Sequence, residues 1–135
     1  MHLRQVESVV NRDAVLDVWE RVLSAPPWPG PQVWIHGDLH PGNLLVDGGR
    51  LSAVIDFGDL TAGDPATDLS LAWMMFAGPE RAVFRNAAGG VDDHTWRRSR
   101  GWALALALAY LANSADNPLL ARIGERTITA VLADT

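Results

Sequence analysis

The sequence predicts a mainly α-helical domain of the α+β class, with one small β-hairpin near its front. Apolar residues recur at helical spacing over most of the chain, and one strong turn signal, Asp47-Gly-Gly-Arg50, lies between two β-prone runs. The 135 residues show no internal repeat and no long linker. A chain of this length buries enough surface for one domain, so we expect residues 1–135 to fold as a single unit.

The first expected helix covers residues 13–23. Apolar residues there recur at intervals of three and four, at Val15, Val18, Trp19 and Val22. Asn11 or Asp13 can cap its start. Four prolines between residues 26 and 31 end it, because proline cannot continue a helix.

The β-structure is expected between residues 33 and 55. Residues 33–36 are a short β-prone run, and the hairpin joins residues 43–46 to residues 51–55. After Asp56 we expect helices to the end of the chain.

These later helices are expected at residues 65–77, 79–88, 93–114 and 118–132. Asp64 opens the first and Gly89-Gly90 closes the second. Asp92 or Asp93 caps the third. Its leucines alternate as in a strand, but a long run of Ala and Leu favours a helix.

Composition excludes several classes of protein. The chain has no cysteine, which removes disulfides, thiolate nucleophiles and cysteine-bound metals. Its net charge of −5 argues against a nucleic-acid surface. The longest apolar run, residues 102–112, is too short to cross a membrane, and nothing resembles a signal peptide. We expect a cytoplasmic protein, with Arg97, Arg98 and Arg100 on a solvated helix face.

Polar residues that can perform chemistry are concentrated between His36 and Asp68. Asp38 precedes the predicted hairpin and Asp56 follows it, so a tight hairpin should bring both acids close to Asn43. Oxygen ligands of this kind suit Mg²⁺, which also binds phosphate oxygens.

Three motifs occur here in order: His36-Gly-Asp-Leu-His-Pro-Gly-Asn43, Asp56-Phe-Gly58 and Gly63-Asp-Pro-x-x-Asp68-Leu. Asn43 lies five positions after Asp38, and this spacing, followed by Asp-Phe-Gly, matches that of kinase catalytic motifs. The chain resembles the C-terminal lobe of the aminoglycoside phosphotransferase family, the small-molecule branch of the protein-kinase-like fold. The resemblance covers residues 33–76 closely and the later helices loosely.

The resemblance implies a role for each matching residue. In the catalytic loop, residues 36–43, Asp38 would accept the proton of the substrate hydroxyl. Asn43 and Asp56, the latter in the metal-binding motif 56–58, would hold Mg²⁺ against the phosphates of ATP or GTP. Structural support would come from three residues of the loops and the helical remainder 64–133, namely His36, Asp64 and Asp68. Two further residues would lie on the substrate side, His40 and Asp59.

The resemblance also implies a hydroxylated small molecule as the acceptor. Gly37 replaces the arginine that receives a phosphorylated activation loop in protein kinases, and only five residues separate Gly58 from Asp64. Those five are too few for a peptide-binding platform. Aminoglycosides as acceptors, and antibiotic resistance as the biological role, are suggested only by association with the family. The sequence does not identify the acceptor, nor does it distinguish ATP from GTP.

A kinase also needs a glycine-rich loop and a lysine over the nucleotide. The chain contains no lysine and no such loop. We therefore expect it to lack an N-terminal lobe, with Met1 starting a fragment or a truncated gene, and to show little or no activity alone.

Two other interpretations remain open. The chain could be a non-catalytic lobe that binds a ligand or a partner chain, including a second copy in a homodimer. More distantly, His36, Asp38 and His40 could bind zinc in a metal-dependent hydrolase.

Overall fold

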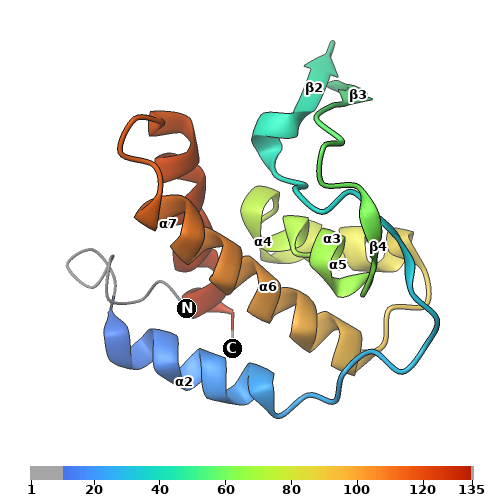
Figure 1. Ribbon diagram of the computed structural model, residues 1–135, viewed down its shortest axis with the longest axis vertical. Coiled ribbons are helices and arrows are strands. Elements are labelled where there is room, and N and C mark those ends of the chain that lie inside the picture. Colours follow the sequence, from blue (N-terminus) through green and yellow to red (C-terminus); the bar gives the residue numbers. More distant parts are fainter. Residues whose placement is uncertain (1–10, 135) are drawn as a thin grey trace.

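The structure is a computed structural model that describes residues 11–134. Most of these residues lie in helices (Figure 1). The helical segments are α2 (Arg12–Leu23), the 3-10 turn η1 (Pro41–Asn43), α3 (Ala66–Leu69), α4 (Leu71–Met75), α5 (Gly78–Ala88), α6 (Asp93–Ala112) and α7 (Pro118–Ala133). The mainly helical α+β character predicted from the sequence is therefore confirmed. None of the helices in this part of the chain is long and apolar enough to span a membrane.

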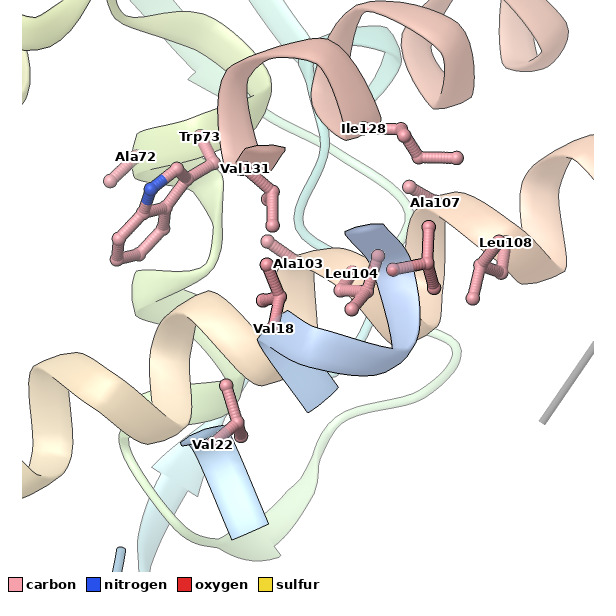
Figure 2. Packing of buried hydrophobic residues seen from close by; sticks show 11 residues of the cluster. Val18, Val22, Ala72, Trp73, Ala103, Leu104, Ala107, Leu108, Ile128 and Val131 are labelled. Atoms are coloured by element: carbon pink, nitrogen blue, oxygen red, sulfur yellow. The ribbon is translucent and has the colours of Figure 1, made fainter. Parts of the chain in front are cut away.

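The hydrophobic core lies where α6 meets α2, α7 and α4 (Figure 2). One face of α6 is completely buried, with Ala103, Leu104, Ala107 and Leu108 each at 0% exposure. This spacing is that of a helix face, so the alternating leucines do not form a strand. Trp73 of α4 is 1% exposed and belongs to the same core.

Two small antiparallel sheets accompany the helices. Strand β2 (Leu44–Asp47) pairs with β3 (Arg50–Val54), forming the predicted hairpin, which projects from the helical body (Figure 1). Its turn residues Gly48 and Gly49 have φ angles of 58° and 79°. Two successive positive φ values are typical of a type I′ turn, which glycine adopts without steric cost.

The second sheet was not predicted. Strand β1 (Val33–Ile35) pairs with β4 (Thr61–Gly63), a segment that the sequence assigns to the start of the helical region. A strand of three residues is too short for an alternating pattern, and its partner lies far away in the chain. The prediction of only helices after Asp56 was therefore wrong at residues 61–63.

The helix predicted at residues 65–77 is divided at Ser70. The Ser70 hydroxyl donates a 2.6 Å hydrogen bond to the carbonyl oxygen of Thr67, between α3 and α4. Such local bonds from serine compete with regular helical bonding. The chain then becomes extended at Phe76, so the second piece ends at Met75.

The arginines of α6 do not all face solvent, contrary to expectation. Arg98 donates from Nε and Nη2 to the two carboxylate oxygens of Asp64, at 2.8 and 3.3 Å. Arg100 donates to the carbonyl oxygens of Val131 and Asp134. Two of these cations thus join α6 to distant parts of the chain, and only Arg97 is exposed.

Candidate active site

The two loops that flank the hairpin lie side by side. The backbone N–H of Ile55 donates to the carbonyl oxygen of Asn43 at 2.9 Å, one step beyond the β2–β3 ladder. The carbonyl oxygen of Ile55 in turn lies 2.8 Å from Nε2 of His36. Residues 36–43 and residues 56–59 therefore form one polar cluster at the base of the hairpin.

His36 is 6% exposed and uses both ring nitrogens to hold the loops. Its Nδ1 accepts the backbone N–H of Asp38 at 3.1 Å, so the ring proton lies on Nε2 and is donated to Ile55. The ring of Phe57 stacks against it at a tilt, with the centroids 4.7 Å apart. His36 thus fixes the backbone of Asp38 relative to the segment that carries Asp56.

Asp68, in α3, holds the start of the same loop. One carboxylate oxygen accepts the N–H of His36 at 2.7 Å and the other accepts the N–H of Gly37 at 3.1 Å. A carboxylate that accepts two backbone donors satisfies groups that would otherwise be unpaired in a partly buried loop.

Gly37 is required by the backbone geometry at this point. Its φ is +90°, and a Cβ added there would lie 2.5 Å from the carbonyl oxygen of Asp59. The backbone of Asp59 therefore packs directly on the loop at residues 36–43, and Asp59 itself is exposed. From the sequence, Gly37 indicates only the absence of an arginine, whereas the steric requirement for glycine comes from the fold.

Asp38 and Asn43 are in direct contact. The amide nitrogen of Asn43 donates to the carbonyl oxygen of Asp38 at 2.8 Å and lies 3.3 Å from its carboxylate. Within the described residues, Oδ1 of Asn43 accepts no hydrogen bond. The side chain of Asp38 is 32% exposed. These bonds fix the loop, while Oδ1 of Asn43 and part of the Asp38 carboxylate stay available to bind a ligand.

His40 is 8% exposed, so it does not lie at the solvent-facing side of the site. Its Nδ1 accepts the N–H of Gly42 at 3.1 Å, and its Nε2 lies 3.3 Å from the amide nitrogen of Asn43 and 3.7 Å from Asp38 Oδ1. Burial lowers the pKa of His40, although the charge of Asp38 acts in the opposite direction. His40 is therefore a neutral ring beneath the loop, packed edge-on against Tyr110.

Asp56 adopts a left-handed backbone conformation with φ of 60°, the only positive φ outside glycine in residues 11–134. This conformation costs on the order of 1 kcal/mol for a residue with a side chain. The two bonds of Ile55 on one side and the packing of Phe57 on the other impose it. Its carboxylate is exposed and makes no hydrogen bond within the described residues. Strain of this kind clusters at functional sites.

Asp64 lies directly before Pro65, the N-cap of α3, and also forms an ion pair. Its Oδ1 accepts the N–H of Ala66, the first residue of α3, at 2.9 Å, so Asp64 braces the start of the helix from one position before the cap. The pair with Arg98, whose side chain is 11% exposed, was missed. No local pattern could have revealed it, because the two residues are 34 positions apart.

The side chains of the candidate site suit Mg²⁺ better than zinc. In residues 11–134 no group of three or more His, Cys, Asp or Glu side chains is placed to hold a metal ion. Zinc bound by His36, Asp38 and His40 does not fit, because neither ring nitrogen of His36 is available. Mg²⁺ fits better, since it needs only one or two protein oxygens when phosphates and water supply the rest. Asn43 Oδ1 and the Asp56 carboxylate meet that requirement.

Comparison with known proteins now decides the family. The family model described as "Phosphotransferase enzyme family" matches residues 2–102. The chain belongs to this family. The match supports a phosphotransferase and names neither nucleotide nor acceptor.

A curated relative adds no function to that assignment. Over 81 residues, this phosphotransferase-family chain is 37% identical to "Uncharacterized protein YcbJ" of Bacillus subtilis (strain 168). The alignment covers 54% of this chain and 26% of the relative, so the chain spans about a quarter of that protein's length. No solved structure matches the chain.

Proposed function

We propose that this chain is the catalytic lobe of a small-molecule kinase that transfers the γ-phosphoryl group of ATP or GTP to a hydroxyl group. The observation that carries the proposal is the exposed carboxylate of Asp56, held in a left-handed backbone conformation directly after Ile55, whose N–H bonds to the carbonyl oxygen of Asn43. Together with Asp38 five positions before Asn43, these residues supply the proton acceptor and the metal ligands of kinase phosphoryl transfer.

In this proposal Asn43 and Asp56 hold Mg²⁺. The bound ion would offset the charge of the phosphate oxygens when the nucleotide is present. Asn43 has a second function, because its amide group also fixes the carbonyl oxygen of Asp38. One side chain thus links the metal-binding half of the site to the half that meets the acceptor.

Asp38 accepts the proton of the acceptor hydroxyl. The hydroxyl oxygen bonds to the γ-phosphorus as the bond to the β-phosphate oxygen breaks, and the nucleoside diphosphate leaves. Asp38 is fixed through its N–H by His36 and through its carbonyl oxygen by Asn43. Because a misplacement of about 1 Å can cost about a hundredfold in rate, the bonds that fix Asp38 contribute to catalysis in this proposal.

The acceptor is a hydroxylated small molecule, and aminoglycosides are one candidate class. Only residues 59–63 separate the Asp-Phe-Gly motif from Asp64, and three of them form β4, which leaves no room for a peptide platform. The exposed carboxylate of Asp59 stands at the edge of the loop and would face such an acceptor. His40 is buried, so in this proposal it would support Asp38 from beneath the loop and would not contact the acceptor.

The test is thermal unfolding with and without Mg²⁺ and ATP. Ligand at a hundred times its dissociation constant adds about 2.7 kcal/mol, which is a rise of several degrees for a domain of this size. We expect a Mg²⁺-dependent rise that disappears in Asp56→Ala. No rise, or an equal rise in the variant, would contradict the assignment of the metal site. We further expect little turnover by the isolated chain, since no lysine is present to hold the phosphates.

A second candidate function is binding of a partner chain, such as an N-terminal lobe or a second copy. Large apolar side chains are exposed on the hairpin and beside Asp56, namely Leu45, Val46, Leu51, Phe57 and Leu60. Exposed apolar groups of this kind mark association sites. Sedimentation of the purified chain over a range of concentrations tests for a dimer, and Leu51→Ser should shift such a dimer toward monomer.

A further inference from the structure

A hollow lies between the start of α5 and one side of α7. Its volume is about 640 Å³, within the range of small-molecule sites. It is lined by residues of these two helices and by Phe76, Ala77 and Asp134, and none of the candidate active-site residues is part of the lining. The hollow is therefore distinct from the candidate active site.

Three arginines line this hollow, and the first is buried. Arg81 is 8% exposed, and its guanidinium donates to the carbonyl oxygens of Ala72 and Phe76 at 3.3 and 3.0 Å. Its nearest carboxylate, on Asp134, lies 3.9 Å from Nη1. Burial lowers the pKa of Arg81, and Asp134 opposes that effect. Arg81 is thus a cation held in place by two carbonyl oxygens and by the ring of Trp73, whose centroid lies 5.4 Å from the guanidinium carbon.

The other two arginines lie one turn apart on α7. Arg122 and Arg126 are four residues apart, and like charges at this spacing destabilise a helix. Arg126 donates to the carbonyl oxygen of Met75 at 3.2 Å. Arg122 makes no hydrogen bond or ion pair with any residue between 11 and 134. An anion between these groups would remove their repulsion.

The acidic residues of the hollow do not cancel this charge. Asp134 accepts a hydrogen bond from the indole N–H of Trp73 at 2.9 Å and faces Arg81. Glu125 is the other carboxylate in the lining, so three cations face two anions. The start of α5 also borders the hollow, because its cap residue Ala77 lines it and offers no side-chain hydrogen bond, while Glu80 in the first turn offsets part of the positive potential of this helix end.

We propose that this hollow binds a small molecule through a phosphate or carboxylate group. Arginine guanidinium groups present paired N–H donors that match both of these anions. Arg122 and Arg126 would contact the anion, with Arg81 as the fixed cation behind them. This proposal does not rest on phosphoryl transfer.

The test uses inorganic phosphate and thermal unfolding, with EDTA present to remove divalent metals. Phosphate is compared with NaCl at equal ionic strength, and succinate at the same ionic strength distinguishes a carboxylate from a phosphate ligand. We expect phosphate, succinate or both to raise the melting temperature by several degrees above the NaCl value at saturation.

Variants locate the binding. Arg122→Gln and Arg126→Gln should each lose most of the rise, whereas Arg97→Gln, the same charge change at an exposed position of α6, should keep it. Asp56→Ala should also keep it, which separates this site from the candidate active site. The proposal is overturned if neither anion exceeds NaCl, if both α7 variants respond like the wild-type chain, or if Asp56→Ala alone abolishes the response.

Discussion

Replacing Asp68 with alanine should destabilise the fold and loosen the catalytic loop. The Asp68 carboxylate accepts the backbone N–H groups of His36 and Gly37, at 2.7 and 3.1 Å. His36 is buried and Gly37 is half-buried, so alanine leaves two donors without a protein partner. Each unsatisfied donor costs about 1–3 kcal/mol, and water entering the vacated space favours the lower end.

The expected loss for Asp68→Ala is therefore about 2–4 kcal/mol in the free energy of unfolding, or about 8–16 °C in melting temperature. Asp68→Asn should lose less, because its amide oxygen can still accept one N–H. Chemical denaturation followed by circular dichroism measures both variants. Asp116→Ala, an exposed carboxylate with no hydrogen bond in the described residues, is the control and should change stability by less than about 0.5 kcal/mol. Equal losses in Asp68→Ala and Asp116→Ala would refute the bracing role.

Three further predictions concern single contacts. Asp64→Asn and Arg98→Gln should each lower the free energy of unfolding by about 2 kcal/mol, because the ion pair is largely buried. The double variant should lose less than the sum of the two, and additive losses in urea unfolding would exclude coupling between the residues. Burial lowers the pKa of His40, so protons favour the unfolded state, and the free energy of unfolding should fall from about pH 7 to pH 5. That fall should be smaller in His40→Gln; an identical pH profile would contradict a buried neutral ring. Gly37→Ala should cost about 2 kcal/mol or more, because it combines a positive φ with a clash, whereas Gly78→Ala, where a Cβ meets nothing within 4 Å, should be nearly neutral in thermal unfolding.

Local sequence patterns predicted the helices and the hairpin well. The 3–4 spacing in α2, the capping residue Asp92 and the glycines of the β2–β3 turn each act over a few residues. Such signals depend on backbone sterics and on one or two hydrogen bonds, so they survive without knowledge of the tertiary fold.

The missed features are those that depend on distant partners. Strand β4 exists because β1 lies beside it, and Arg98 is buried because Asp64 lies opposite. Gly37 is needed because the backbone of Asp59 passes close to it. None of these contacts leaves a periodic trace in the sequence.

The candidate site contains features that the local sequence predicted and features that only the tertiary structure revealed. The motif spacing pointed to Asp38, Asn43 and Asp56, and the hairpin predicted that they would lie close together. The left-handed backbone of Asp56 and the burial of His40 came only from the structure. Placing His40 beneath the loop changes its proposed part from substrate contact to support of Asp38.

The claim that Asn43 and Asp56 hold the metal–nucleotide complex is tested most directly by paramagnetic broadening of backbone amide signals. Mn²⁺ replaces Mg²⁺ in the complex with ATP, and the backbone amide signals of the protein are followed by nuclear magnetic resonance. We predict broadening centred on residues 43 and 55–58, absent without ATP and lost in Asp56→Asn, with α2 unaffected. Broadening centred elsewhere, or unchanged in Asp56→Asn, would contradict the proposed site.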